Sequence, residues 1–410
     1  PLPAELYGQL RANSKGLDLA NDSALAQLNQ TAQQFAKHQW SAAPMGEHIQ
    51  TNEAVAPQSI INPARHTDVV GYVQEATTEQ VEQALNNAQA VQDIWARTAK
   101  DTRASYLLRA ADLMEARLEE LMVLLCRESG KTYANAIAEV REAVDFLRYY
   151  ATQMIDLDAN AEVEPLGTML CISPWNFPLA IFTGQVAAAL VAGNTVIAKP
   201  AEQTPLIAAQ AIQILWQAGV PQAAVQLMPG RGETVGAQLS AAEQVQGIMF
   251  TGSTEVVKIL QKTVAKRLSK NGESIPLIAE TGGQNAMIVD SSALTEQVVL
   301  DVVSSAYDSA GQRCSALRVL CVQEDNADAV IQMLKGAMQQ LQVGNPYLLK
   351  TDIGPVIDAE AQENIQKHID KMRQKGHRVH QLMRNDAQDS ELDAGTFITP
   401  TLIELPNLND

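Results

Sequence analysis

The chain has 410 residues and a formal net charge of −17 at pH 7, with 46% hydrophobic and 19% charged residues. This length exceeds one ordinary hydrophobic core and predicts two or more domains. No apolar run is long enough to span a bilayer, and the negative charge opposes phosphate backbones and anionic membranes. The composition therefore predicts a soluble globular chain and argues against nucleic-acid or membrane-surface binding.

The cysteines favour a reducing cytoplasm. The chain has four of them, Cys126, Cys171, Cys314 and Cys321, and their spacing resembles neither a metal site nor a disulfide framework. We therefore expect a cytoplasmic protein with no metal centre. The chain begins at Pro1 without a charged and apolar leader, so we expect no secretory signal and a chain cut from a longer polypeptide.

The first part of the chain predicts an arm followed by strands and long helices. Residues 1–59 are polar and rich in Ala, Gln and Asn, which favours an arm with short helices. Strands are expected at residues 60–63 and 69–73, and helices at residues 78–97, 101–128 and about 133–150.

Local signals support these helices. Thr77 and Gln80 have capping-box spacing at the first helix, and Asp101 is placed to cap the second. The third helix carries one apolar stripe, which we expect to face the core, formed by Ile137, Val140, Val144 and Leu147.

From residue 167 onward strands and helices alternate. Strands are expected at residues 169–172, 195–198, 225–228 and 247–251, and helices at 179–191, 205–216, 233–239 and 255–268. Short connections in such an alternation predict an α/β fold with parallel strands and right-handed crossovers. A dinucleotide should bind at the carboxyl ends of those strands.

Two Gly-containing turns could receive a phosphate. Residues 230–236 have the spacing GxGxxxG, which close helix packing explains about as well. Residues 250–254, Phe-Thr-Gly-Ser-Thr, run from a strand directly into a helix N-terminus, where backbone N–H groups favour a phosphate. A plain glycine turn is the alternative there.

Three other stretches carry candidate catalytic or binding residues. Cys314 lies in a small-residue turn between an amphipathic run and a β-branched run, so its thiolate could meet a substrate; the alternative is a small core side chain. Asn176 lies between two prolines, in a stiff loop suited to fixing an amide donor or simply making a turn. Lys199 and Glu202 follow a strand and could bind ribose hydroxyls or form a solvated ion pair.

Glu280 is the candidate base, because it lies between a buried-looking strand and a Gly-Gly turn. All six histidines lie at or before His66 or at or after His368, outside these motifs. A Cys–His pair of the protease type would need a distant histidine to fold back.

Five motifs, in this order and spacing, resemble the aldehyde dehydrogenase superfamily: Pro-Trp-Asn-Phe-Pro, Lys-Pro-Ala-Glu, Phe-Thr-Gly-Ser-Thr, Glu-Thr-Gly-Gly and Gly-Gln-Arg-Cys. The resemblance covers residues 60–403. Residues 6–8, 11–21 and 139–150 are similar to one branch, the glutamate-semialdehyde (1-pyrroline-5-carboxylate) dehydrogenase module of bifunctional proline utilization A.

The resemblance implies NAD-dependent oxidation of L-glutamate γ-semialdehyde to L-glutamate, in proline catabolism. Cys314 would attack the aldehyde and form a thioester, the Asn176 amide and the Cys314 N–H would hold the oxyanion, and Glu280 would activate the hydrolytic water. The implied NAD contacts are Lys199 and Glu202 at the adenosine ribose, Gly252 and Ser253 at the pyrophosphate, and Trp175 in the cofactor cleft. Glu142 and Ser315 would line the substrate pocket.

The resemblance also implies an organisation. An arm at residues 1–59 would precede an NAD-binding domain at 60–281 and a truncated catalytic domain at 282–410, which together form an aldehyde dehydrogenase-like α/β fold. A covalently linked proline dehydrogenase domain and a homo-oligomer are expected in the full-length protein. The alternatives are a different aldehyde substrate, or a non-catalytic structural or interaction protein that keeps the fold.

Two departures from the family pattern stand out. Gln284 replaces a lysine that many relatives carry after the Gly-Gly pair. The chain also ends at Asp410, before the Glu-x-Phe-Gly-Pro segment, the substrate-anchoring loop and the oligomerisation strand. We expect unpaired sheet edges near residues 397–402, so that the isolated chain binds the adenosine part of NAD, oxidises little aldehyde and self-associates.

Overall fold

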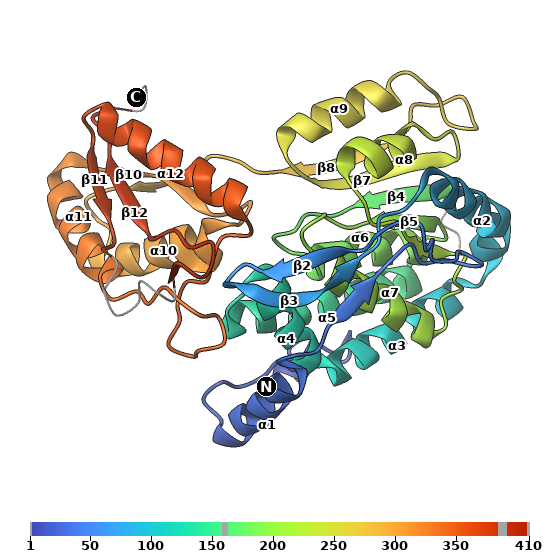
Figure 1. The fold of residues 1–410 in the computed structure, drawn as a ribbon, viewed down its shortest axis with the longest axis horizontal. Coiled ribbons are helices and arrows are strands. Elements are labelled where there is room, and N and C mark those ends of the chain that lie inside the picture. Colours follow the sequence, from blue (N-terminus) through green and yellow to red (C-terminus); the bar gives the residue numbers. More distant parts are fainter. Residues whose placement is uncertain (1, 158–162, 384–391, 408–410) are drawn as a thin grey trace. The chain divides into compact units, whose positions relative to one another are not determined.

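The computed structural model describes residues 2–157, 163–383 and 392–407. They form two compact units, each made of several stretches of chain (Figure 1). The first unit comprises Pro1–Ile60, Val69–Glu128 and Ala136–Thr281, and the second comprises Ile61–Asp68, Ser129–Asn135 and Gly282–Asp410. No helix among the described residues is both long and apolar enough to cross a membrane.

The first unit is built on a five-stranded parallel sheet with the strand order β6-β5-β4-β7-β8. Its strands are β4 (Thr168–Ile172), β5 (Thr195–Lys199), β6 (Val225–Leu227), β7 (Val245–Gly252) and β8 (Leu277–Thr281). The residues of β5 and β6 are buried throughout, as expected for strands covered on both faces. The predicted parallel α/β fold is confirmed.

The helices that follow these strands are α6 (Ala180–Val191), α7 (Pro205–Ala218), α8 (Ala237–Ala241) and α9 (Thr254–Val264). The helix predicted at residues 233–239 is wrong in part, because Gly232–Gly236 forms a π-helical turn before α8. The helix predicted to reach residue 268 ends at Val264.

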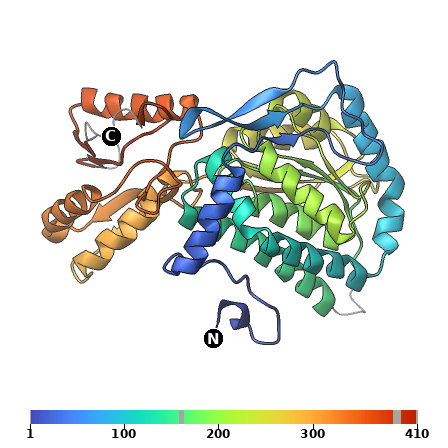
Figure 2. The same cartoon turned by 60° about the horizontal axis from the view of Figure 1, so that its bottom comes forward.

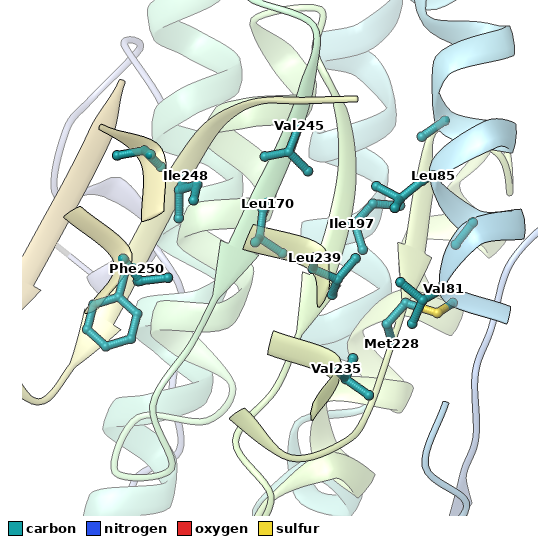
Figure 3. Packing of buried hydrophobic residues seen from close by; sticks show 14 of the residues in the cluster. Val81, Leu85, Leu170, Ile197, Met228, Val235, Leu239, Val245, Ile248 and Phe250 are labelled. Atoms are coloured by element: carbon teal, nitrogen blue, oxygen red, sulfur yellow. The ribbon is translucent and has the colours of Figure 1, made fainter. Parts of the chain in front are cut away.

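One face of the sheet packs against α2 (Thr78–Arg97), α8 and α9. Figure 3 shows Leu170 of β4 and Ile197 of β5 in the middle of this layer, with Ile248 of β7 on one side of them and Val81 and Leu85 of α2 on the other. All five side chains are buried, so adjacent strands contribute to one continuous core. Helices α6 and α7 contact α3 (Lys100–Ala116), which belongs to a further helical layer.

The capping box predicted for α2 is confirmed. The Gln80 N–H donates to the Thr77 hydroxyl at 3.3 Å, and the Thr77 N–H donates to the Gln80 side chain at 2.9 Å. The cap predicted at Asp101 is wrong: α3 begins one residue earlier, so Asp101 lies in its first turn, where a carboxylate favours the helix dipole.

The helix predicted at residues 101–128 is two helices, α3 and α4 (Leu118–Ser129). Arg117 separates them, with φ −103° and ψ 17°. Its guanidinium bonds Glu120 at 2.7 Å and Gln210 of α7 at 2.6 Å, so a contact from outside the helix accompanies the break.

The third helix, α5 (Tyr133–Asp156), is longer than predicted. Its apolar stripe is buried as expected, with Ile137 9% exposed and Val140, Val144 and Leu147 at most 1%. On another side of α5, Asp145 accepts from the N–H and the hydroxyl of Ser14 at 2.8 and 2.7 Å. These bonds fix the N-terminal arm to α5.

The arm contains the short helices that were predicted, η1 (Pro3–Glu5) and α1 (Asp22–Phe35). Figure 2 shows α1, in blue, beside the teal helices, and Thr31 of α1 donates to Glu119 of α4 at 2.7 Å. A three-stranded sheet follows, with β1 (Trp40–Ala42), β2 (Gln58–Asn62) and β3 (Arg65–Val73) in the order β1-β3-β2.

In the second unit, β9 (Asn285–Val289) pairs in parallel with β10 (Leu317–Val322). Helices α10 (Thr295–Tyr307) and α11 (Glu324–Met338) bury Val299, Val302 and Leu334 with this pair. Helix α12 (Ala359–Gln374) precedes an antiparallel pair, β11 (Arg378–Gln381) and β12 (Thr401–Glu404). The strand expected near residues 397–402 therefore lies later, and Phe397 is a fully buried core residue before it.

Candidate active site

Most candidate residues lie at the carboxyl edge of the five-stranded sheet. The register pairs Ile172 of β4 with Lys199 and with Phe250, and pairs Thr251 with Glu280. Parallel strands end at the same edge, so residues that follow one strand lie beside residues that follow its neighbour. The structure thus brings seven predicted residues to this edge: Trp175, Asn176, Lys199, Glu202, Gly252, Ser253 and Glu280.

Asn176 lies in the loop that joins β4 to α6. The Ser173 N–H donates to the Lys199 carbonyl at 3.2 Å, which fixes the start of the loop against β5. At the other end, one carboxylate oxygen of Glu139 accepts from the N–H groups of Leu179 and Ala180 at 2.9 and 3.0 Å. Asn176 is half-buried between these two anchors.

No function was predicted for Glu139 individually, although it is only 1% exposed. A signal was present in its helical neighbours. Ala136 and Ala143 lie three residues before it and four after it on α5, and both are fully buried. A carboxylate between two small apolar residues on one helical face indicates a buried polar contact.

Lys199 and Glu202 form the next group along the edge. Lys199 is 3% exposed, and its ammonium lies 3.0 Å from the Pro200 carbonyl and 3.5 Å from Glu202. Burial lowers the pKa of Lys199, and the Glu202 carboxylate opposes that change. Glu202 is exposed and also accepts from the Gly232 N–H at 2.7 Å, so the GxGxxxG stretch lies against this pair.

Ser253 marks the start of α9. Its hydroxyl accepts from the Val256 N–H at 3.3 Å, and Gly252 is the last residue of β7. The predicted passage from strand directly into helix is confirmed. N–H groups in the first turn of a helix have no partner within the helix, and they favour an anion.

Glu280 lies within β8 and is exposed, as is Glu142 on α5. Glu280 pairs in register with Thr251, whose hydroxyl accepts from the Gln185 side chain of α6 at 3.1 Å. The first unit therefore holds the candidate base, the candidate amide donor and all the candidate cofactor residues.

Cys314 and Ser315 lie in the second unit, in a turn closed by the Ala316 N–H donating to the Arg313 carbonyl at 3.2 Å. Cys314 is exposed, whereas Cys126 and Cys171 are buried and Cys321 is half-buried. Burial raises the pKa of the Cys171 thiol. Cys314 is therefore the most accessible of the four thiols, and its role as the nucleophile stays a prediction.

The backbone before Cys314 is strained. Ser309 and Ala310 both have φ 55°, and Gly311 has φ 70°. Left-handed backbone is costly for residues other than glycine and persists only where surrounding contacts hold it. Here Asp308 binds Arg313 at 2.6 Å and accepts from Asn135 at 2.7 Å, while Arg318 donates to the Gly311 carbonyl at 2.8 Å.

Comparisons with known proteins give the family. The aldehyde dehydrogenase family matches residues 49–409. The bifunctional protein PutA of Escherichia coli (strain K12) is 60% identical over 406 residues, covering 99% of this chain and 31% of that protein. A 1-pyrroline-5-carboxylate dehydrogenase of Anoxybacillus flavithermus is 36% identical over 395 residues, covering 93% of this chain and 75% of that protein.

A crystal structure gives the same result. The 1-pyrroline-5-carboxylate dehydrogenase from Thermus with bound NAD superposes with a TM-score of 0.87 at 31% identity, covering 95% of this chain and 77% of that chain. The chain thus spans about a third of the length of its bifunctional relatives and about three quarters of the shorter ones. The resemblance found in the motifs is confirmed, and the chain belongs to the aldehyde dehydrogenase family.

Proposed function

We propose that this chain is the aldehyde-oxidising part of an NAD-dependent enzyme that converts L-glutamate γ-semialdehyde, formed from 1-pyrroline-5-carboxylate, to L-glutamate. The observation that carries the proposal is the exposed Cys314, which lies in a turn held by side-chain hydrogen bonds. The chain that carries it is similar to enzymes named 1-pyrroline-5-carboxylate dehydrogenase. The similarity covers nearly the whole chain, which supports the same substrate.

The proposed reaction begins when the Cys314 thiolate forms a bond to the aldehyde carbon. The carbonyl oxygen then takes the negative charge, and the Asn176 amide and the Cys314 N–H stabilise it. Bound NAD would supply the hydride acceptor, and loss of hydride from that carbon would leave a thioester to Cys314. Glu280 takes a proton from water, whose oxygen displaces the sulfur, and the carboxylic acid leaves.

The residues at the sheet edge fit NAD. The Glu202 carboxylate and the Lys199 ammonium suit ribose hydroxyls, and the N-terminus of α9 at Gly252 and Ser253 suits a diphosphate. Trp175 is half-buried beside Asn176 and offers an apolar surface to the cofactor. We assign residues 60–281 to NAD binding, with residues 1–59 as an arm, and residues 282–410 to catalysis.

The substrate residues and the wider assembly are also proposals. Ser315 is exposed next to Cys314, and Glu142 is exposed on α5, which supports a role for both with the substrate. We propose that a proline dehydrogenase domain is joined to this chain in the full-length protein, which forms a homo-oligomer. The four scattered cysteines, in a spacing unlike a disulfide framework, support a reducing cytoplasmic location.

The decisive experiment measures NADH formation by the full-length protein with a panel of aldehydes. Glutamate γ-semialdehyde should give the highest kcat/KM, and C314A should abolish turnover. A better substrate of different chemistry would replace the assignment by another aldehyde. NADH formation with none of them would favour a non-catalytic protein that keeps the fold.

A further inference from the structure

Two buried glutamates each lie at the start of a helix distant from them in sequence. Glu139 accepts the Leu179 and Ala180 N–H groups of α6 through one oxygen, Oε1. Glu128 accepts the Leu206 N–H of α7 on Oε1 at 2.6 Å and the Ile207 N–H on Oε2 at 2.9 Å. Both glutamates are 1% exposed, so each satisfies N–H groups that water does not reach.

Two other helices of the same unit are capped by the side chain of the residue that directly precedes them. The hydroxyls of Thr77 and Ser253 cap α2 and α9 from the residue before each helix. In the described part of the chain, the residues at that position in α6 and α7, Leu179 and Thr204, make no side-chain cap. These two helices therefore depend on the side-chain carboxyl groups of glutamates in α4 and α5.

Each of these helices follows a loop of the candidate site. Helix α6 follows residues 173–178, which contain Asn176, and Glu139 fixes the first backbone N–H after that loop. Helix α7 follows Lys199 and Glu202, and Glu128 fixes the second and third residues of that helix. A serine or threonine cap would stabilise the helix alone, whereas a carboxyl group from a remote helix also fixes where the capped helix and its loop lie.

We propose that Glu139 and Glu128 are positioning residues with separate tasks: Glu139 sets the Asn176 loop for the oxyanion, and Glu128 sets the Lys199–Glu202 segment for the dinucleotide. This inference rests on the proposed function. Neither glutamate is assigned a contact with the reacting atoms. Each acts through the backbone that carries a site residue.

The geometry also predicts different responses to glutamine. At position 139 both N–H groups donate to one oxygen, and an amide oxygen can accept both. At position 128 each oxygen accepts one N–H, so an amide would turn an NH₂ donor towards a backbone donor. We therefore expect E139Q to rescue most of the E139A defect, and E128Q to rescue little of the E128A defect.

The test compares these four variants in the full-length protein. E139A should slow single-turnover NADH formation with glutamate γ-semialdehyde by about 10²-fold, the loss typical of one oxyanion donor, and leave the Kd of NAD within about threefold. E128A should raise the Kd of NAD about tenfold or more and leave the single-turnover rate at saturating NAD near that of the wild type. T77A is the matched control, since it removes a helix cap away from both loops and should lower only the Tm.

A second readout needs no cofactor or substrate. Hydrogen exchange of the ligand-free protein should accelerate at residues 173–182 in E139A and at residues 199–208 in E128A, with little change in the other segment. Equal acceleration in both segments, or equal losses of rate and NAD affinity in both variants, would overturn the separate tasks. Wild-type protein that forms no NADH with any aldehyde would instead reject the proposed function, and the exchange pattern would still decide whether the two glutamates fix these loops.

Discussion

The side-chain amide of Asn285 donates to the carbonyl oxygen of Cys314 at 2.7 Å and to that of Ala316 at 3.0 Å. Asn285 is the first residue of β9, so a strand of the second unit directly holds the turn that presents the thiol. Both bonds come from one amide group, and no other residue type of the same size donates two hydrogen bonds this way.

Asn285→Ala should therefore loosen the Cys314 turn. We expect kcat to fall at least about tenfold, because small displacements of a nucleophile are costly, with little change in the KM for NAD. Asn285→Asp should be worse, since a carboxylate faces two carbonyl oxygens without a proton to donate. Steady-state kinetics of both variants measure this, and an aspartate variant as active as the wild type would contradict the role of the amide.

Alkylation at neutral pH should modify Cys314 before the other cysteines. Its thiol is exposed, whereas burial of Cys171 raises its thiol pKa and blocks access. Peptide mapping after a short exposure to iodoacetamide measures the order of labelling. Cys321 is the internal control because it is only half-buried, and preferential labelling of Cys171 would remove Cys314 as the nucleophile.

Glu280→Gln in the full-length protein should separate the two halves of the reaction. The amide is nearly isosteric but cannot take a proton from water, so a burst of NADH should precede a stall at the thioester. Steady-state turnover should fall by about 10²-fold to 10⁴-fold. Stopped-flow absorbance gives both phases, and unchanged turnover would show that another group activates the water.

The dinucleotide site should prefer NAD to NADP. The exposed Glu202 carboxylate, held by the Gly232 N–H, would meet a 2′-phosphate as a like charge. Repulsion of about 1 kcal/mol at 4 Å in water corresponds to about a fivefold difference in Kd. Calorimetry at matched ionic strength measures the Kd values of NAD and NADP. Glu202→Gln should reduce the difference between them. Tighter binding of NADP than of NAD by the wild type would contradict the placement of Glu202 at the ribose.

Glu128 should give the fold a recognisable pH dependence. Burial raises its pKa from 4.5 to about 8, although the Leu206 and Ile207 N–H groups oppose the shift. The folded state then holds a proton that the unfolded state loses, so this contribution is full below pH 4.5 and is lost as the pH rises to about 8. One proton gives a slope of at most about 1.4 kcal/mol per pH unit.

Urea unfolding of the wild type and E128Q across pH 5–9 measures this contribution as the difference between the two curves. Subtracting one curve from the other cancels the contribution of the other carboxyl groups to the free energy of unfolding, because they titrate in both proteins. A wild-type stability that rises relative to E128Q over this range would show that Glu128 is ionised in the folded protein.

Local signals in the sequence were enough to predict the strands and turns that carry the site. The passage from β7 into α9 at Ser253 and the capping box of Thr77 and Gln80 depend on residues within a few positions of each other. The break at Arg117 could not be predicted in this way, because its guanidinium bonds Gln210, 93 positions away. Likewise Glu139 and Glu128 accept hydrogen bonds from N–H groups 40 and 78 positions away, and no local pattern in the sequence predicts which N–H groups these are.

The second unit is assembled from three stretches of chain that lie far apart in sequence. Thr396 donates to the Pro63 carbonyl at 2.8 Å, and a Cβ added at Gly354 would collide with the carbonyl of Gly130. During translation, residues 61–68 and 129–135 leave the ribosome well before residues 282–410, which they pack against. This unit must therefore finish folding late, and a gene fragment that starts at residue 282 would encode only part of it.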